Sequence, residues 1–206
     1  KTLGSGPVDA IRYLVSKLRL IIGTAGADLA LVSSAIDETL TPTSPGRPVA
    51  FATGGSANVR AVHLDDNAIS VHRSTQRINM TTPSGNAFAG YKPLDLTMLV
   101  PDLLAAGVVS IAVQRQPDTR LHCVLGNGRV GILTYEPDEE VVAWSMWRGD
   151  TGTVPTVERV AVLPGTNEDA VFYHIRRTIN GATKRYLEKW AKESECVGDS
   201  GLTGWL

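Results

Sequence analysis

The stretch Val59-Arg60-Ala61-Val62-His63-Leu64 recurs twice, as Val108-Val109-Ser110-Ile111-Ala112-Val113 and as Val157-Glu158-Arg159-Val160-Ala161-Val162. The copies begin at 59, 108 and 157, so they are 49 residues apart both times (108 − 59 and 157 − 108). A fainter copy, Ile11-Arg12-Tyr13-Leu14-Val15, begins 48 residues before the first (59 − 11). Repeats of short antiparallel strands at roughly 40–50 residues are typical of β-propeller blades. The spacing therefore predicts an all-β chain of propeller-like blades.

Each copy is followed by two further strand-like runs. The second runs are Leu18 to Ile22, Ile69 to Arg73, Arg120 to Leu125 and Ala170 to Ile175, and the third runs are Asp28 to Val32, Gln76 to Met80, Val130 to Tyr135 and Lys184 to Trp190. Their apolar residues alternate, so that Leu121, Cys123 and Leu125 share one face. Val171, Tyr173 and Ile175 do the same, with His174 and Arg176 opposite. The nearly all-apolar run Val141 to Trp147 is predicted to be a strand covered on both faces.

The connections between these runs carry hairpin chemistry. Asn127-Gly128 and Asn180-Gly181 are dipeptides that accept a positive φ at low cost. A sandwich of unrelated strands is the alternative fold, but it does not explain the equal spacing. Four copies would just close the smallest propeller, so the predicted β-propeller-like domain over residues 1–190 can also be an incomplete one.

Three segments depart from the strand pattern. Apolar residues fall at helical spacing from Leu96 to Leu104, and a short helix is expected near 101–106, between Pro101 and Gly107. Residues 34–58, rich in Thr, Pro, Gly and Ser, are expected to be a long irregular connection with a role at a subunit interface. Residues 191–206 are expected to be a linker into a missing C-terminal segment.

Composition excludes several classes of protein. An apolar fraction of 43% in 206 residues can bury a core, and 20% charged residues are too few for a disordered chain. The net charge of −1 lacks the basic excess of a protein that binds nucleic acid by bulk electrostatics. No apolar run approaches the ~20 residues of a membrane helix. The two cysteines, Cys123 and Cys196, cannot form a disulfide framework, and both are predicted to be free thiols.

Two motifs resemble functional signatures. The run from Gly126 to Gly131 spells G-x-G-x-x-G, but strand residues follow it where a dinucleotide fold needs a helix. Gly198-Asp199-Ser200-Gly201 resembles the nucleophile loop of trypsin-like proteases, but the upstream histidine base and buried aspartate are missing. The first motif is therefore interpreted as a hairpin, and the second is assigned no catalytic role.

The remaining candidates for ligands also have simpler interpretations. His63 and His72 could face each other on neighbouring strands, yet two histidines make a poor metal site. The acidic groups Glu136 to Glu140 and Glu168-Asp169 are expected to be solvated turns. Trp144, Trp147 and Trp190 could line a sugar groove, but Trp144 and Trp147 are three apart and should point to opposite faces of a strand. We therefore predict no catalytic residue, no metal site and no cofactor.

An ordered series of modest motifs runs along the chain. It consists of Pro7 to Thr24, Leu40-Thr41-Pro42-Thr43, Ser56-Ala57-Asn58-Val59, Asp95-Leu96-Thr97-Met98-Leu99, Val108 to Trp147, Val160-Ala161-Val162-Leu163-Pro164-Gly165, Arg176-Arg177-Thr178-Ile179-Asn180-Gly181 and Arg185-Tyr186-Leu187-Glu188-Lys189. This succession, over about residues 7–190, resembles the tail nozzle or packaged-DNA stabilisation proteins of short-tailed bacteriophages and prophages.

The resemblance implies a propeller-bearing structural subunit with no enzyme activity. It implies a homo-oligomeric ring, usually six-fold, below the portal and adaptor and above a fibre or spike. Such a ring retains the packaged DNA and becomes part of the genome-ejection channel, with DNA only as passing cargo. The expected location is the virion tail, after assembly in the bacterial cytoplasm. Two other classes stay open: a host-surface or glycan-binding propeller module, and, ranked last, a propeller hydrolase.

Overall fold

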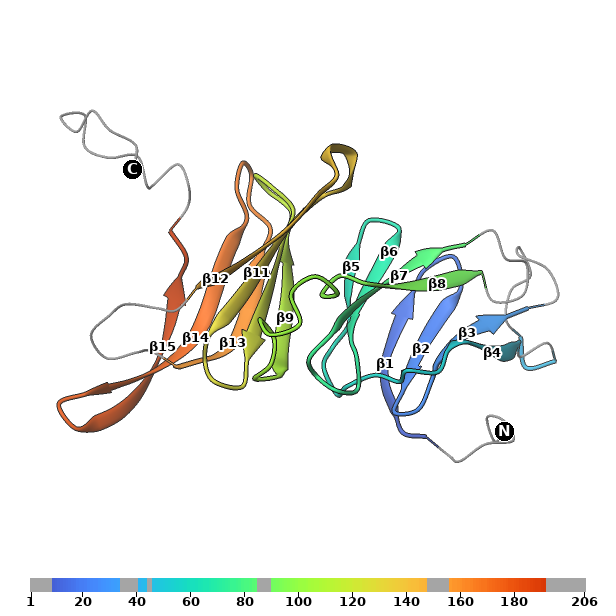
Figure 1. Ribbon diagram of the computed structural model, residues 1–206, viewed down its shortest axis with the longest axis horizontal. Coiled ribbons are helices and arrows are strands. Elements are labelled where there is room, and N and C mark those ends of the chain that lie inside the picture. Colours follow the sequence, from blue (N-terminus) through green and yellow to red (C-terminus); the bar gives the residue numbers. More distant parts are fainter. Residues whose placement is uncertain (1–8, 34–40, 44–45, 85–89, 148–155, 192–206) are drawn as a thin grey trace.

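The computed structural model describes residues 9–33, 41–43, 46–84, 90–147 and 156–191. Over these residues the regular secondary structure is almost entirely β, arranged in four antiparallel sheets. Each sheet takes its strands from one continuous stretch of sequence, and strands that follow one another in the chain are neighbours in the sheet. Figure 1 shows the four sheets following one another along the long axis of the molecule.

The strands are short and each sheet is a simple meander. The first sheet contains β1 (Ile11–Ser16), β2 (Leu20–Thr24), β3 (Asp28–Val32) and β4 (Arg47–Ala52). The second contains β5 (Val62–Leu64), β6 (Asn67–Val71), β7 (Ile78–Pro83) and β8 (Tyr91–Asp95). The third contains β9 (Val108–Gln114), β10 (Arg120–Leu125), β11 (Val130–Glu136) and β12 (Val141–Trp147), with the 3-10 turn η1 (Pro137–Glu139) before β12. The fourth contains β13 (Thr156–Leu163), β14 (Ala170–Ile179) and β15 (Ala182–Lys189).

The repeat in the sequence corresponds to the first strands of three sheets. Val62, Ile111 and Val160 lie in the first strands β5, β9 and β13. Their partners across the ladder lie in the second strands and are Ile69, Cys123 and Tyr173. The predicted succession of antiparallel modules and the all-β class are therefore confirmed at the level of strands. The three positions are not equivalent in orientation: Val62 packs toward the sheet that follows its own, whereas Ile111 and Val160 pack toward the sheet that precedes theirs.

The core consists of three apolar layers, one between each pair of successive sheets. The layer between the first and second sheets contains Tyr13, Val15, Ile21, Ala30, Ala61, Ala68 and Tyr91. The second layer, between the second and third sheets, includes Ile69, Ile78, Met80, Ile111, Leu121, Cys123, Leu125 and Leu133. The third, between the third and fourth sheets, includes Val124, Val130, Ile132, Val157, Val171, Tyr173 and Ile175. Successive sheets therefore pack face to face, and the predicted shared faces of β10 and β14 are confirmed.

Each sheet has a corner where the chain turns from its first strand to its second. Polar contacts link these corners from one sheet to the next. The Lys17 ammonium of the first sheet donates to the backbone carbonyl of Asp65, in the β5–β6 turn. The guanidinium of Arg115, just after β9, donates to the Asp65 carboxylate over 3.2 Å. The backbone N–H of Arg115 donates over 2.7 Å to Asp169, in the β13–β14 connection. Equivalent corners of all four sheets are thus linked in order.

The hairpin turns form where the sequence predicts them. Asn180 and Gly181 both have a positive φ, 51° and 75°, which is the combination that a two-residue hairpin between β14 and β15 requires. Gly128 has a φ of 80° between β10 and β11. The G-x-G-x-x-G run therefore forms a hairpin, as predicted from the sequence.

The predicted helix near 101–106 is wrong. The segment after β8 forms successive tight turns, in which Val100 N–H donates to Thr97, Leu103 to Val100 and Gly107 to Leu104. Each of these bonds spans three residues rather than the four of an α-helix. Pro101 has no N–H to donate, and the Asp95 carboxylate accepts from the Thr97 N–H over 2.8 Å, which favours a turn at the start of the segment.

Two further expectations need correction. Residues 34–58 are not one irregular connection, because 47–52 form β4 and Ser56, Ala57 and Val59 are buried nearby. β12 is not covered on both faces: it is an edge strand, and half of the Val142 surface is exposed (50%). The strand with nearly every residue buried is β10, in the middle of the same sheet. The expected linker, 191–206, lies outside the described residues except for Ala191.

The turns from Thr97 to Gly107 provide a matched test of the packing. Leu104 is fully buried in the core between the second and third sheets, whereas Leu99 is 92% exposed. Leu104→Ala should lower the free energy of unfolding by about 2–5 kcal/mol, because it leaves a cavity in that layer. Leu99→Ala should change it by less than about 0.5 kcal/mol. Urea denaturation of both variants measures these changes. Equal losses of stability would contradict the observed turns and favour the predicted helix, in which both leucines lie on one apolar face.

Candidate functional site

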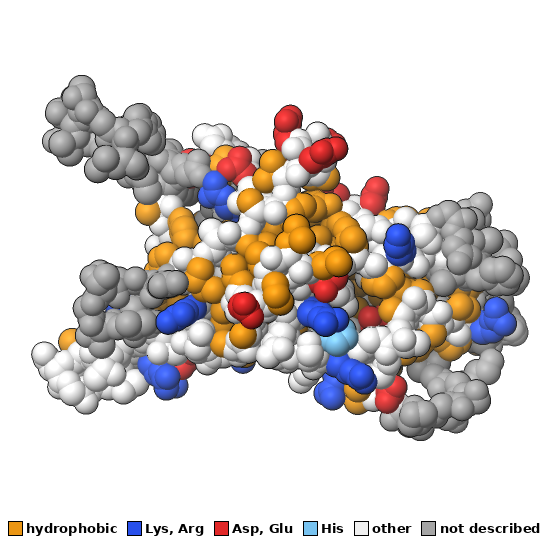
Figure 2. Space-filling view, in the orientation of Figure 1, with side chains coloured by type: hydrophobic (Ala, Val, Ile, Leu, Met, Phe, Trp, Pro, Cys, Tyr) orange, Lys and Arg blue, Asp and Glu red, His pale blue; other side chains and the backbone are white. Residues whose placement is uncertain are grey.

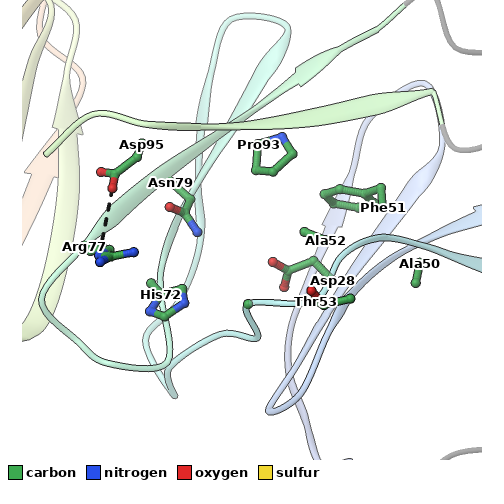
Figure 3. A pocket seen from close by; sticks show the side chains of 11 residues that line it. Asp28, Ala50, Phe51, Ala52, Thr53, His72, Arg77, Asn79, Pro93 and Asp95 are labelled. Carbon is green, nitrogen blue, oxygen red and sulfur yellow. Dashed lines mark ion pairs between the residues drawn. The ribbon is translucent and has the colours of Figure 1, made fainter. Parts of the chain in front are cut away.

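A polar pocket lies between the first and second sheets. Its cavity volume is about 510 Å³, and its lining comes from β3, β4 and the segment after β4 on one side and from β7, β8 and the loop after β6 on the other. Figure 3 shows the side chains of the two sheets across this space. The lining residues are Asp28, Ala50, Phe51, Ala52, Thr53, Gly54, His72, Arg77, Asn79, Pro93 and Asp95.

Asp28 is the buried carboxyl group of the pocket. It begins β3 and is only 3% exposed. The Ser56 hydroxyl donates to its Oδ1 over 2.6 Å. Burial raises the pKa of Asp28, while hydrogen bonds from Ser56 and Tyr13 act in the opposite direction. Asp28 therefore serves as a hydrogen-bonding group whose charge the fold disfavours.

Tyr13 completes the polar network behind Asp28. Its ring lies directly against Gly23, since a Cβ added there would stand 2.1 Å from the ring atom Cε1. Burial, followed by the nearby Asp28 carboxyl, raises the pKa of Tyr13 to about 12. The phenol is therefore neutral at ordinary pH. A glycine on β2 thus lets an aromatic ring reach across its own sheet toward the carboxyl group.

The tautomer of His72 follows from its neighbours. The backbone N–H of Ser74 donates to the Nδ1 atom over 3.1 Å, so Nδ1 is an acceptor. The proton of the neutral ring therefore sits on Nε2, which lies beside Gly54 at the pocket wall. Burial and then the nearby Arg77 lower the pKa of His72, which favours this neutral form. The ring thus presents an N–H donor at the pocket.

The remaining groups supply both kinds of hydrogen-bonding partner and an apolar wall. Arg77 and Asp95 form an ion pair at 4.0 Å at the second-sheet side. Asn79, on β7, contributes an amide that can donate and accept. Phe51 comes from β4, and its ring centroid is 5.8 Å from that of Tyr91. The arrangement can bind a polar molecule through several oriented hydrogen bonds.

His63 and His72, which could have faced each other on neighbouring strands, lie in different pairings. In the ladder His63 pairs with Ala68, whereas His72 forms an isolated bridge with Ser56. Within the described ranges, no three His, Cys, Asp or Glu side chains gather as metal ligands.

The tryptophans behave as their spacing predicts. The indole N–H of Trp144 donates to the Leu96 carbonyl over 2.9 Å, on the side of the second sheet. Trp147 stacks on Tyr173 of the fourth sheet, with ring centroids 5.7 Å apart and planes 8° from parallel. Trp190 joins that same cluster. The two tryptophans of β12 therefore point to opposite faces, and the three do not form a common sugar groove.

A second buried polar network surrounds His122, which is 1% exposed. The Gln114 amide nitrogen donates to the Gln116 carbonyl, so its Oε1 faces His122 Nε2 at 3.1 Å and accepts that proton. His122 Nδ1 then accepts from the Tyr173 hydroxyl over 2.7 Å. Burial, with Arg120 nearby, lowers the pKa of His122 to about 4. The ring is held neutral in the layer between the third and fourth sheets.

The acidic turns differ from one another. Figure 2 shows acidic side chains gathered at the tip of the β11–β12 hairpin, where Asp138, Glu139 and Glu140 are exposed as predicted. Asp169 is buried instead (9% exposed), because its carboxylate accepts the backbone N–H groups of Arg115 and Gly165. The expectation of a solvated turn is wrong for Asp169.

Of the two cysteines and the protease-like motif, only Cys123 lies within the described residues. Cys123 is a buried free thiol whose pKa is raised by burial, as predicted for a residue on an apolar strand face. Cys196 and the run from Gly198 to Gly201 lie outside the described residues.

A carboxylate on the outer face of the fourth sheet was not singled out from the sequence. Glu158 lies at an irregularity in the pairing of β13 and contacts His174 at 3.1 Å, Arg176 at 3.8 Å and Arg185 at 3.0 Å. The hydrogen bond from Arg185 lowers the pKa of Glu158. One histidine and two arginines thus share a single carboxylate as their partner.

The pocket residues were not found from the sequence either. One usable signal was present: Asp28, Ala30 and Val32 alternate along one strand, so a carboxylate stands at an inward-facing position. A buried carboxyl group in such a place indicates a hydrogen-bonded network or a site.

Neither the protein-family models nor the curated proteins contain a match to this chain. Among the described residues, no helix has the length and apolar character needed to cross a membrane.

The neutral state of His122 generates a pH prediction. A histidine takes up a proton near pH 6.5 in the unfolded chain and near pH 4 in this fold, so between these values the unfolded state binds more protons. Stability is therefore lost as the pH falls from about 6.5 to about 4, by about 3 kcal/mol from this group. Urea denaturation at several pH values should show a shallower acid loss in His122→Gln than in the unchanged protein. Parallel pH profiles for the two proteins would contradict the assignment.

Proposed function

We propose that the four sheets are successive blades of a β-propeller and that the protein is a structural subunit of a bacteriophage tail, in its nozzle or hub ring. The observation that carries the first part is the topology: each sheet is a meander built from one stretch of sequence, and the three repeat copies occupy the first strands of successive sheets. Face-to-face packing of successive meander sheets, with linked corners, is consistent with the blades of a propeller.

The end sheets support the proposed assembly. Exposed apolar side chains stand on β1 and the turn after it, and others stand on the strands of the fourth sheet. Leu14 is 59% exposed at one end of the stack and Leu187 is 70% exposed at the other. Contacts between unlike surfaces of identical subunits generate rings when the rotation closes. Function then resides in subunit contacts, and the protein acts without catalysing a reaction.

The chain's charge supports a role beside DNA rather than one of binding it tightly. Lysine and arginine total 20 against 21 acidic residues. Each phosphate that a protein neutralises adds affinity, so a strongly basic channel would retard the passing genome. We infer a ring, six-fold in the resembled family, that retains packaged DNA and forms part of the ejection channel. Its neighbours would be the portal or adaptor on one side and a fibre or spike on the other, in a virion tail assembled in the host cytoplasm.

A host-surface or glycan-binding module is the second candidate. The polar pocket between the first and second sheets favours it, because the pocket offers oriented donors and acceptors beside an aromatic ring. The two candidates differ in assembly: a tail nozzle requires a closed ring, and a binding module does not.

Electron microscopy of the full-length protein tests the ring. We expect closed rings with a central channel. Leu14→Glu and Leu187→Glu should each convert rings into monomers without loss of folding, because each places a charge on an exposed apolar end face. Leu99→Glu is the matched control. Leu99 is 92% exposed, but it lies in the connection between β8 and β9 and not on an end sheet. Monomers of the unchanged protein, or rings that survive both end-face variants, would contradict the proposed assembly.

A further inference from the structure

We propose that the pocket between the first and second sheets binds a neutral pyranose, as one sugar unit of a polysaccharide. This inference rests on the pocket of the glycan-binding candidate, to which it gives a ligand class, and it is independent of the tail assignment. The ligand class follows from three properties of the lining: its buried acceptor, its oriented donors and its balanced charge.

The buried acceptor is the carboxyl group of Asp28. Two carboxylate oxygens can accept about four hydrogen bonds. Ser56 supplies one to Oδ1, and Tyr13 supplies another. Acceptor positions therefore remain on the side where the carboxyl group points into the space between the sheets (Figure 3). Buried polar atoms are nearly always satisfied in folded proteins, so a ligand hydroxyl is a suitable partner.

The donors stand mainly on the opposite side of the cavity. His72 Nε2–H is available because Nδ1 is occupied by the Ser74 backbone. No hydrogen bond holds the Asn79 amide among the described residues, and its place on β7 puts it across from Asp28. A sugar hydroxyl both donates and accepts, so it can bridge such a pair of groups, whereas an aliphatic ligand cannot.

The charges and walls exclude other ligands. Arg77 and Asp95 compensate each other's charge, and burial raises the pKa of Asp28 and so disfavours its ionised form; the described lining therefore offers no uncompensated charge to a phosphate or to a cation. Phe51 and Pro93 provide apolar surface for the C–H face of a sugar ring. The edge strands at the pocket contain Pro48 in β4 and Pro93 in β8, which remove backbone donors that an added peptide strand would need. The volume of about 510 Å³ falls within the roughly 300–1,000 Å³ of ligand sites.

The test is an NMR titration with three neutral probes: the methyl β-pyranosides of glucose, galactose and N-acetylglucosamine. At least one should shift the side-chain signals of Asn79 and His72, with a dissociation constant on the order of 1 mM. Asn79→Ala should weaken that binding by about fivefold to tenfold, since it removes one hydrogen bond to the ligand. Thr82→Ala is the matched control, because it lies on the same strand but points to the opposite face of the sheet.

A second variant narrows the site without removing a polar group. In Gly54→Ala the new Cβ would stand 3.0 Å from His72 Nε2, so it should crowd the donor and weaken binding. The proposal is overturned if no probe shifts these signals, if Asn79→Ala binds as tightly as the control, or if inorganic phosphate binds there more tightly than every sugar. Loss of the ring assembly would not affect this result, so failure of either proposal is distinguishable from failure of the other.

Discussion

The structure depends on covering both faces of its middle sheets. In the second sheet Ala68 faces the first layer of the core while its neighbour Ile69 faces the next, and in the third sheet Cys123 and Val124 divide in the same way. A sheet with two apolar faces is stable only between two others. Stacking of successive meanders follows directly, because short connections place each sheet beside the one that precedes it in the chain.

Polar groups within these layers are tolerated because they satisfy one another. His122, Gln114 and Tyr173 form one closed set, and Asp28 with Ser56 forms part of another. The two sets differ in one respect. The His122 ring has both nitrogens occupied by protein groups, whereas the Asp28 carboxyl retains acceptor positions at a cavity. The first set therefore orients the third and fourth sheets, and the second is available for a ligand.

The proposed assembly and the proposed sugar site use different parts of the same stack. Apolar side chains at the two ends favour contacts between subunits, because an end sheet has one face without a neighbouring sheet in the described chain. The pocket lies between sheets and uses only groups of one subunit. A ring that contacts a polysaccharide through such pockets would combine both, with several weak sites acting together on one polymer.

The sequence by itself determined the all-β class, the order of most strands and the placement of Val62, Ile111 and Val160 on the first strands of successive sheets, because alternation and hairpin dipeptides are local and the repeat multiplies them. The helix predicted from the apolar spacing between Leu96 and Leu104 was wrong, because Pro101 and the Asp95 contact that starts a turn oppose a helix there. The sequence also failed at β12, since an apolar run does not reveal whether a strand is central or at an edge. Only the tertiary structure decided the pocket: Asp28, His72 and Asn79 come from strands and loops far apart in the chain. Their hydrogen-bonding roles depend on which neighbours packing leaves beside them, and no local pattern records that.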